Sequence, residues 1–145
     1  MANVVIRSLT GPELEAATLY GLLRLRAEVF VVEQASPYLD PDGRDLEPST
    51  IHLWAEGAGE VVGCVRIVAE PSGVRRIGRV VAAKPHRGTG LAAELMGRAV
   101  ELAGQEPIVL DAQAHLEGWY RKLGFVRTGP VFDEDGIAHV PMRRG

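Results

Sequence analysis

The sequence has very little cysteine and no long apolar run. Cys64 is the only cysteine among 145 residues, which excludes an intramolecular disulfide and a cysteine-rich zinc site. No stretch approaches the about 18 consecutive apolar residues of a membrane-spanning helix. The first residues also lack the basic segment and apolar core of an export signal. We therefore expect a cytoplasmic protein that has no membrane as a partner.

A strong excess of charge of one sign is missing as well. The formal net charge of −3 gives no electrostatic reason to expect a nucleic acid as a partner. Hydrophobic residues make up 46% of the chain, and a chain of this length can bury about two thirds of its unfolded surface. We expect residues 1–145 to form a single domain, as a monomer or a homodimer.

Residue patterns predict seven strands and three helices. The strand-like segments are 4–9, 52–56, 61–70, 75–82, 108–110, 125–128 and 137–142. The segments with helical spacing are 14–30, 91–102 and 117–123. Between the first helix and the second strand lies an irregular segment, 33–50, that is rich in proline and acidic residues. The order of these elements predicts an α/β or α+β domain with a mixed sheet.

A glycine-containing loop, Lys84 to Ala92, follows a predicted strand and precedes a predicted helix. Glycines allow a ligand to approach the backbone closely, and the first N–H groups of a helix have no partner within the helix. Together with the positive charge of Arg87, these donors could bind a pyrophosphate. A simple strand-to-helix turn with basic surface residues is the alternative.

A dinucleotide site is a second alternative for this loop. Residues 88–93 match the fingerprint G-x-G-x-x-A, and Asp111 follows at about the distance of the acid that binds the ribose. However, residues 84–87 separate the first glycine from the strand. Only one short helix and two strands are predicted after Asp111, too few for the repeated units of a dinucleotide fold. Both observations disfavour this alternative.

Two motifs resemble those of the Gcn5-related N-acetyltransferase (GNAT) superfamily. Residues 87–92 fit the pattern R-x-x-G-x-A of its acyl-CoA pyrophosphate loop, and residues 119–125 resemble its F-Y-x-x-x-G-F segment. Segments 30–45, 112–116 and 135–139 are further similar to the ElaA-like subfamily.

The resemblance implies a mixed α/β GNAT fold, in which helices flank a twisted sheet of about six to seven strands. The fourth and fifth strands would splay into a V-shaped opening that holds acetyl-CoA as co-substrate, with no metal. The residues that would bind the cofactor are Val80, Val81, Ala82, Arg87, Gly88, Thr89, Gly90, Leu91, Ala92 and Gln113. Many family members carry asparagine at the position of Gln113 and proline at that of Lys84; glutamine keeps the amide chemistry.

The catalytic residues are less well defined. Tyr120 matches the family tyrosine that protonates the departing thiolate; packing of its ring in the core is the alternative. Glu33, at the end of the first helix, is a candidate base for the amine and otherwise an exposed helix-end residue. His139 could titrate near neutral pH, but a lone histidine on a strand is usually structural. Cys64 lies in a strand run, as a small buried hydrophobic residue would.

The resemblance, together with these residues, implies direct transfer of an acetyl group from acetyl-CoA to a primary amine in a ternary complex. The acceptor would be a small molecule or a peptide. The acids between Glu33 and Glu47 would favour cationic amines if this segment lined the acceptor site. A non-catalytic acyl-CoA-binding module and an N-acyltransferase for longer acyl chains are the alternatives.

Overall fold

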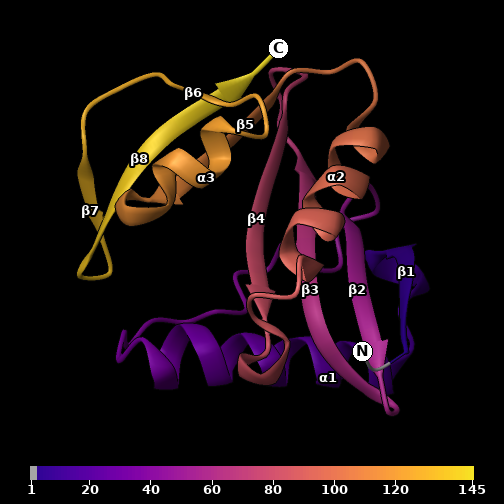
Figure 1. Cartoon of the computed structure of the whole chain (residues 1–145). Coiled ribbons are helices and arrows are strands. Elements are labelled where there is room, and N and C mark those ends of the chain that lie inside the picture. Colours follow the sequence, from indigo (N-terminus) through magenta and orange to yellow (C-terminus); the bar gives the residue numbers. More distant parts are fainter. Residues whose placement is uncertain (1–2) are drawn as a thin grey trace.

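A computed structural model describes residues 3–145 and contains one eight-stranded sheet (Figure 1). The strands are β1 (Val4–Thr10), β2 (Ile51–Gly57), β3 (Glu60–Ala69), β4 (Arg75–Ala82), β5 (Ile108–Gln113), β6 (Val126–Arg127), β7 (Phe132–Glu134) and β8 (Ile137–Arg144). Their order is β1-β2-β3-β4-β5-β8-β6, and β7 pairs with β8. The mixed sheet confirms the predicted fold class. The strand beyond the predicted seven is β7, a three-residue segment that pairs with β8 across a tight turn.

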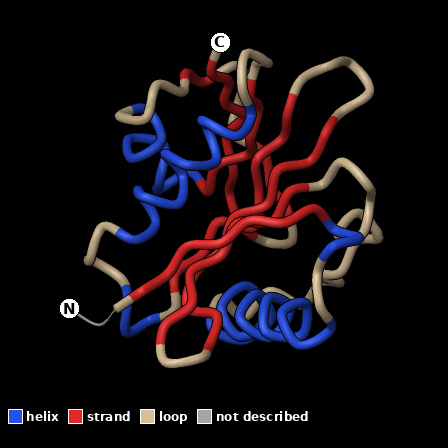
Figure 2. Tube along the Cα trace, turned by 90° about the vertical axis from the view of Figure 1, so that its right-hand side faces the viewer, coloured by secondary structure: helices blue, strands red, loops and turns tan. Residues whose placement is uncertain are grey.

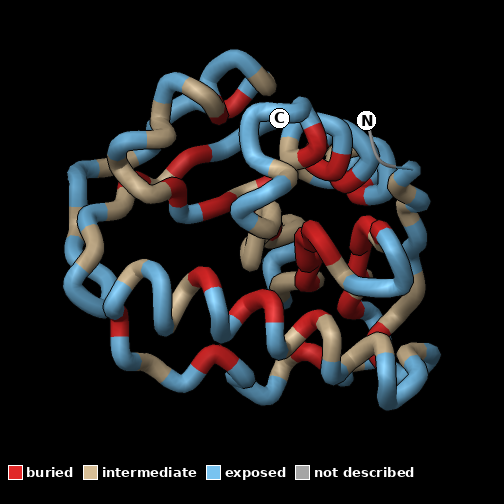
Figure 3. The backbone as a smooth tube through the Cα atoms, turned by 60° about the horizontal axis from the view of Figure 1, so that its bottom comes forward, coloured by how far each residue is buried: buried red, intermediate tan, exposed pale blue. Residues whose placement is uncertain are grey.

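Helices cover both faces of the sheet (Figure 2). They are α1 (Ala16–Arg26), α2 (Leu91–Ala103) and α3 (Glu117–Arg121), and a π-helix, Ala27–Glu33, continues α1. One apolar cluster joins α1 to one face of the sheet, and another joins α2 and Tyr120 of α3 to the opposite face. Buried and exposed positions alternate along the helices, as expected for elements that pack on one side only (Figure 3).

The first helix differs from the predicted range, 14–30. Thr10 and Glu13 form a capping box, but it caps a separate 3-10 turn, Gly11–Glu13. A Cβ atom at position 11 would lie 2.3 Å from the backbone oxygen of Asp45, so this turn requires a glycine. The extended backbone of Leu14 then ends the turn, and α1 begins at Ala16.

The sheet opens between β4 and β5. These parallel strands pair only at Arg75 with Ile108 and at Arg76 with Val109. The register between β3 and β4 shifts beyond Gly78, which leaves Arg79 and Val80 opposite one residue of β3 in a β-bulge. The bulge bends β4 away from β5 and β8, and Figure 1 shows the strands diverging. This is the predicted V-shaped splay.

The strand directions argue against the dinucleotide alternative. Among the strand pairs of residues 3–145, β4–β5 is the one parallel pair, and all the others are antiparallel. A dinucleotide fold needs repeated parallel strand-helix-strand units. Within the described part of the chain, no helix is long and apolar enough to cross a bilayer.

Candidate active site

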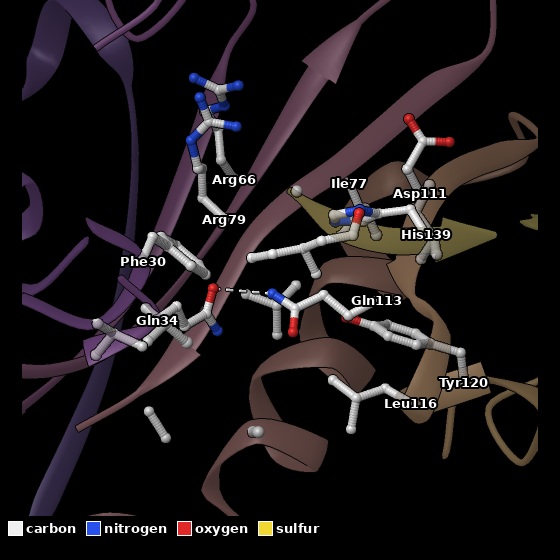
Figure 4. A pocket seen from close by; sticks show the side chains of 18 of the residues that line it. Phe30, Gln34, Arg66, Ile77, Arg79, Asp111, Gln113, Leu116, Tyr120 and His139 are labelled. Carbon is white, nitrogen blue, oxygen red and sulfur yellow. Dashed lines mark hydrogen bonds between the residues drawn. The ribbon is translucent and has the colours of Figure 1, made fainter. Parts of the chain in front are cut away.

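The splay between β4 and β5 contains a cleft of about 900 Å³ (Figure 4). Its walls come from the π-helix and the loop after it, from β4, from the start of α2, from β5 and α3, and from the turn between β7 and β8. The cleft brings together all the predicted cofactor and catalytic residues except Thr89. The Thr89 hydroxyl instead donates a hydrogen bond to the His86 carbonyl oxygen at 2.6 Å.

The turn before α2 has the geometry of an anion site. Gly88 and Gly90 have φ angles of 75° and 86°, a left-handed conformation that favours glycine. A Cβ atom added at either glycine would meet nothing within 4 Å, so the turn faces open space. Among the described hydrogen bonds, none is donated by a backbone N–H of residues 88–90. These donors, at the positive end of the thirteen-residue helix α2, fit a pyrophosphate.

Arg87 forms an ion pair with Glu33, another of the predicted site residues. Its Nη1 lies 2.6 Å from Glu33 Oε2, and its Nη2 lies 2.8 Å from Glu33 Oε1. The Nε atom also donates a hydrogen bond to the Ala82 carbonyl oxygen at 3.0 Å. The hydrogen bonds from Arg87 hold the pKa of the Glu33 carboxyl below its usual value. The predicted base and the predicted phosphate ligand thus form one ion pair across the mouth of the cleft.

This ion pair predicts that Glu33→Gln tightens the binding of coenzyme A. Arg87 must give up Glu33 before it can bind the pyrophosphate with its full hydrogen-bonding fork, and an amide competes for it less than a carboxylate does. Because exposed ion pairs contribute little, the gain should be at most about fivefold. Isothermal titration calorimetry of the wild type and of Glu33→Gln with coenzyme A measures this gain in affinity. The matched control replaces Glu28, an exposed acid of the π-helix that does not line the cleft. If Glu33→Gln binds coenzyme A more weakly than the wild type, the prediction is wrong.

Tyr120 extends from α3 into the cleft, close to Gln113 (Figure 4). Its ring packs edge-to-face against Trp119 and Phe125, with centroids 4.9 and 6.1 Å away. The residue is 7% exposed, and burial raises the pKa of its hydroxyl to about 12. The hydroxyl therefore stays protonated at neutral pH and can donate a hydrogen bond within the cleft.

Gln113 connects the two walls of the cleft. Its Nε2 donates to Gln34 Oε1 at 3.1 Å, which joins β5 to the end of the π-helix (Figure 4). A ligand that occupies the cleft between these walls must pass or replace this contact. Gln34 was not among the predicted site residues, although it follows Glu33 directly.

His139 lies in the cleft as well. It stands opposite Gln113 in the antiparallel register of β5 and β8, so both side chains lie on the same face of the sheet. The ring stacks on Phe132 at 5.8 Å, and Nδ1 lies 2.7 Å from the carbonyl oxygen of Ile137. The sequence offered His139 as a candidate but did not place it beside Gln113, because strand registers are not readable from one sequence.

A largely buried ion network, part of which lines the cleft, was not predicted from the sequence. Arg26, at the end of α1, donates to Asp40 at 2.8 Å and to Asp45 at 2.8 Å. The rest of the network comprises Arg66, which bonds to Asp42 and Asp45, and Arg79, which contacts Asp40 and Asp42. Arg79 is the bulge residue of β4 and has a φ angle of 53°.

The network changes the electrostatic expectation for the acidic segment. Each of its five acids has a basic partner: Glu33 pairs with Arg87, Asp40 and Asp45 with Arg26, Asp42 with Arg66, and Glu47 with Arg44. Their fields largely cancel at the distance of a bound ligand. The expected preference for cationic acceptors therefore loses its electrostatic basis.

Among residues 3–145, no group of three or more His, Cys, Asp or Glu side chains is placed to hold a metal ion.

Comparison with known proteins agrees with this geometry. A family model described as an acetyltransferase (GNAT) domain matches residues 14–144. A UPF0039 protein of Mycobacterium tuberculosis is 46% identical over 143 residues, which cover 96% of this chain and 92% of that protein. Protein ElaA of Escherichia coli is 38% identical over 138 residues, 91% of this chain and 90% of that one. The crystal structure of an acyl-CoA N-acyltransferase from Pseudomonas aeruginosa has a TM-score of 0.94 and 41% identity, over 99% of this chain and 100% of that one.

The open mixed sheet of this chain thus has the fold of an acyl-CoA N-acyltransferase. The chain belongs to the acetyltransferase (GNAT) domain family. Within it, the chain is ElaA-like, as its motifs predicted.

Proposed function

We propose that the protein transfers an acetyl group from acetyl-CoA to a primary amine of a small molecule or a peptide. The observation that carries this proposal is the shape of the cleft. An unpaired edge of β4, an open glycine turn at a helix amino terminus and the Tyr120 hydroxyl lie along one cavity. Transfer is direct, within a ternary complex, since Cys64, the one cysteine, is buried and the pKa of its thiol is raised to about 12 by burial.

The parts of the cleft fit successive parts of acyl-CoA. The turn at residues 88–90 and Arg87 suit the pyrophosphate, because they combine backbone donors with a fixed positive charge. The edge of β4 from Val80 to Ala82 faces away from β3 into the splay and suits the amide groups of pantetheine. Bound acyl-CoA supplies the thioester that the amine attacks.

Two side chains have predicted roles in proton transfer. Tyr120 would donate a hydrogen bond to the departing sulfur, since its hydroxyl is protonated and points into the cleft. The role of Glu33 as base stays a prediction, because Arg87 must release its carboxylate first.

Coenzyme A should raise the melting temperature of the protein through this turn. At 100 times its dissociation constant, a ligand adds about 2.7 kcal/mol, which corresponds to roughly 5–10 °C for a chain of this size. Arg87→Ala should reduce the shift, because the pyrophosphate loses a charged partner. Differential scanning fluorimetry measures the melting shift of the wild type and of Arg87→Ala, first with coenzyme A and then, separately, with NAD.

Arg98→Ala is the matched control for this measurement. It also removes an exposed arginine paired with a glutamate, Glu94, but at a position of α2 that does not line the cleft. Its shift should equal that of the wild type. A protein that ignores coenzyme A and responds to NAD would overturn the proposed cofactor.

The catalytic part of the proposal needs a separate experiment. A panel of amines is incubated with acetyl-CoA, and thiol release is followed with a chromogenic disulfide. Release that depends on both protein and amine supports an enzyme, whereas binding of coenzyme A without release points to an acyl-CoA-binding module. Faster release from longer acyl-CoA thioesters would favour an N-acyltransferase for longer chains.

A further inference from the structure

We propose that His139 is the general base that takes the proton from the acceptor amine. This inference rests on the proposed acyl transfer and adds a residue to its catalytic set. It places the base on β8, on the same side of the cleft as Gln113 and Tyr120 (Figure 4).

The hydrogen bond at Nδ1 sets the tautomer of the imidazole. A carbonyl oxygen only accepts, so Nδ1, at 2.7 Å from the Ile137 oxygen, carries a proton. In the neutral ring, Nε2 then keeps its lone pair. Stacking on Phe132 further fixes the plane of the ring. His139 therefore presents a base in one orientation, with 12% of its side chain exposed.

Glu33 is poorly placed for the same task. Both of its carboxylate oxygens accept hydrogen bonds from Arg87, and these bonds keep its pKa below the usual value for glutamate. If Arg87 turns to the pyrophosphate, Glu33 stands beside a bound anion at the cofactor end of the cleft. In the described structure, no hydrogen bond or ion pair joins His139 to the glycine turn, and its ring nitrogen Nε2 makes no hydrogen bond.

The charged groups around His139 come from β4, β5, β7 and the turn that follows β7. Glu134 of β7 lies nearest, with Oε2 at 3.8 Å from Nε2, and Asp135 follows it in the turn before β8. Asp111 of β5 lines the same cleft and is paired with Arg76 of β4 at 3.3 Å. Across the cleft, Arg79 is occupied by Asp40 and Asp42. The carboxylate of Glu134 is therefore close enough to attract both an arriving ammonium group and the imidazolium that forms.

Acyl transfer removes two protons from the nitrogen of the acceptor ammonium group. The ammonium group of the acceptor gives one proton to His139 Nε2, and the neutral amine attacks the thioester carbon. The new C–N bond forms, the C–S bond breaks, and the thiolate leaves within reach of the Tyr120 hydroxyl. The second amine proton passes to the sulfur, which leaves as the free thiol. His139 returns its proton to water after the products leave.

Two substitutions separate this chemical role from a structural one. Asparagine at position 139 can repeat the hydrogen bond from Nδ1 to the Ile137 oxygen, but it has no basic nitrogen. Glutamine can place an amide near the position of Nε2, and it cannot take a proton either. For the best amine of the screen, His139→Asn and His139→Gln should both lower kcat about 100-fold, the lower end of the usual range for a general base. KM for acetyl-CoA and the melting shift caused by coenzyme A should stay at wild-type values.

The pH profile supplies a second readout. The acid-side limb of kcat, measured with saturating amine, should lie at the same pH in the wild type and in Glu33→Gln. In both His139 variants it should move to higher pH, because only an amine that has already lost its proton can then attack. Nitrogen-15 NMR of the histidine-labelled protein should show the proton of neutral His139 on Nδ1. Full activity of His139→Asn, a limb that moves to higher pH in Glu33→Gln alone, or a proton on Nε2 of the neutral ring would each overturn the proposal. A wild type that transfers acyl groups while the variants are unimpaired refutes His139 alone, whereas an inactive wild type refutes the proposed function together with it.

Discussion

Arg26→Ala should lower the free energy of unfolding by about 3–5 kcal/mol, because it leaves two buried carboxylates without their main partner. The side chains of Arg26, Asp40 and Asp45 are 1%, 3% and 9% exposed. Water cannot replace the guanidinium there, so each carboxylate keeps the cost of its desolvation. Urea denaturation followed by circular dichroism measures the difference.

Two further variants keep this prediction testable. Arg24→Ala removes an exposed arginine from the same helix and should change stability by less than about 0.5 kcal/mol. Arg26→Lys preserves the charge without the planar guanidinium. Its loss in free energy of unfolding should therefore lie between the losses of Arg24→Ala and Arg26→Ala. Equal stability of Arg26→Ala and Arg24→Ala would show that the network does not hold the fold together.

The same network predicts how stability depends on pH. Burial alone would raise the pKa of Asp45, but the hydrogen bonds and charge of Arg26 outweigh it and hold that pKa below the usual 3.8. A depressed carboxyl pKa contributes stability that is present above pH 3.8 and lost as the pH falls through the folded value. In Arg26→Ala the folded pKa rises, so acid unfolding should begin at a higher pH than in the wild type.

Local sequence patterns predicted much of the fold. The glycine turn before α2 and the nearly continuous apolar runs of β2 and β3 depend on neighbouring residues, and the sequence shows these directly. The two motifs added the splay between the fourth and fifth strands, because both come from one family with one topology. The π-helix after Arg26 was missed, since it continues the helical spacing of α1 without a change in composition.

Contacts between distant residues were beyond such patterns. Arg87 and Glu33 are 54 positions apart and were assigned to different roles, yet they bind each other. The arginine at position 26 falls on the apolar side of α1, next to Leu22 and Leu25, which was a signal of a buried charge. Its partners lie in an irregular loop whose path no periodicity describes.

Tyr120→Phe should lower kcat about 10- to 100-fold and leave the affinity for acetyl-CoA nearly unchanged. A hydroxyl whose pKa is about 12 is a weaker acid than a thiol, whose pKa is about 8.5, so complete proton transfer to the thiolate is uphill. Tyr120 would act mainly through a hydrogen bond to the sulfur as negative charge develops on it. Such a bond forms only as the C–S bond breaks, which explains an effect on turnover rather than on binding.

The pH dependence distinguishes this hydrogen bond from titration of the tyrosine. Because the hydroxyl is protonated far above neutral pH, the ratio of wild-type to Tyr120→Phe kcat should be constant from about pH 6 to pH 9. Tyr20→Phe removes the hydroxyl of an exposed tyrosine on α1 and should leave kcat unchanged. If Tyr120→Phe matches the wild type at every pH, the tyrosine only packs against Trp119 and Phe125. If instead the ratio falls toward one as the pH rises within this range, the hydroxyl ionises more easily than its burial implies, and full proton transfer replaces the hydrogen bond.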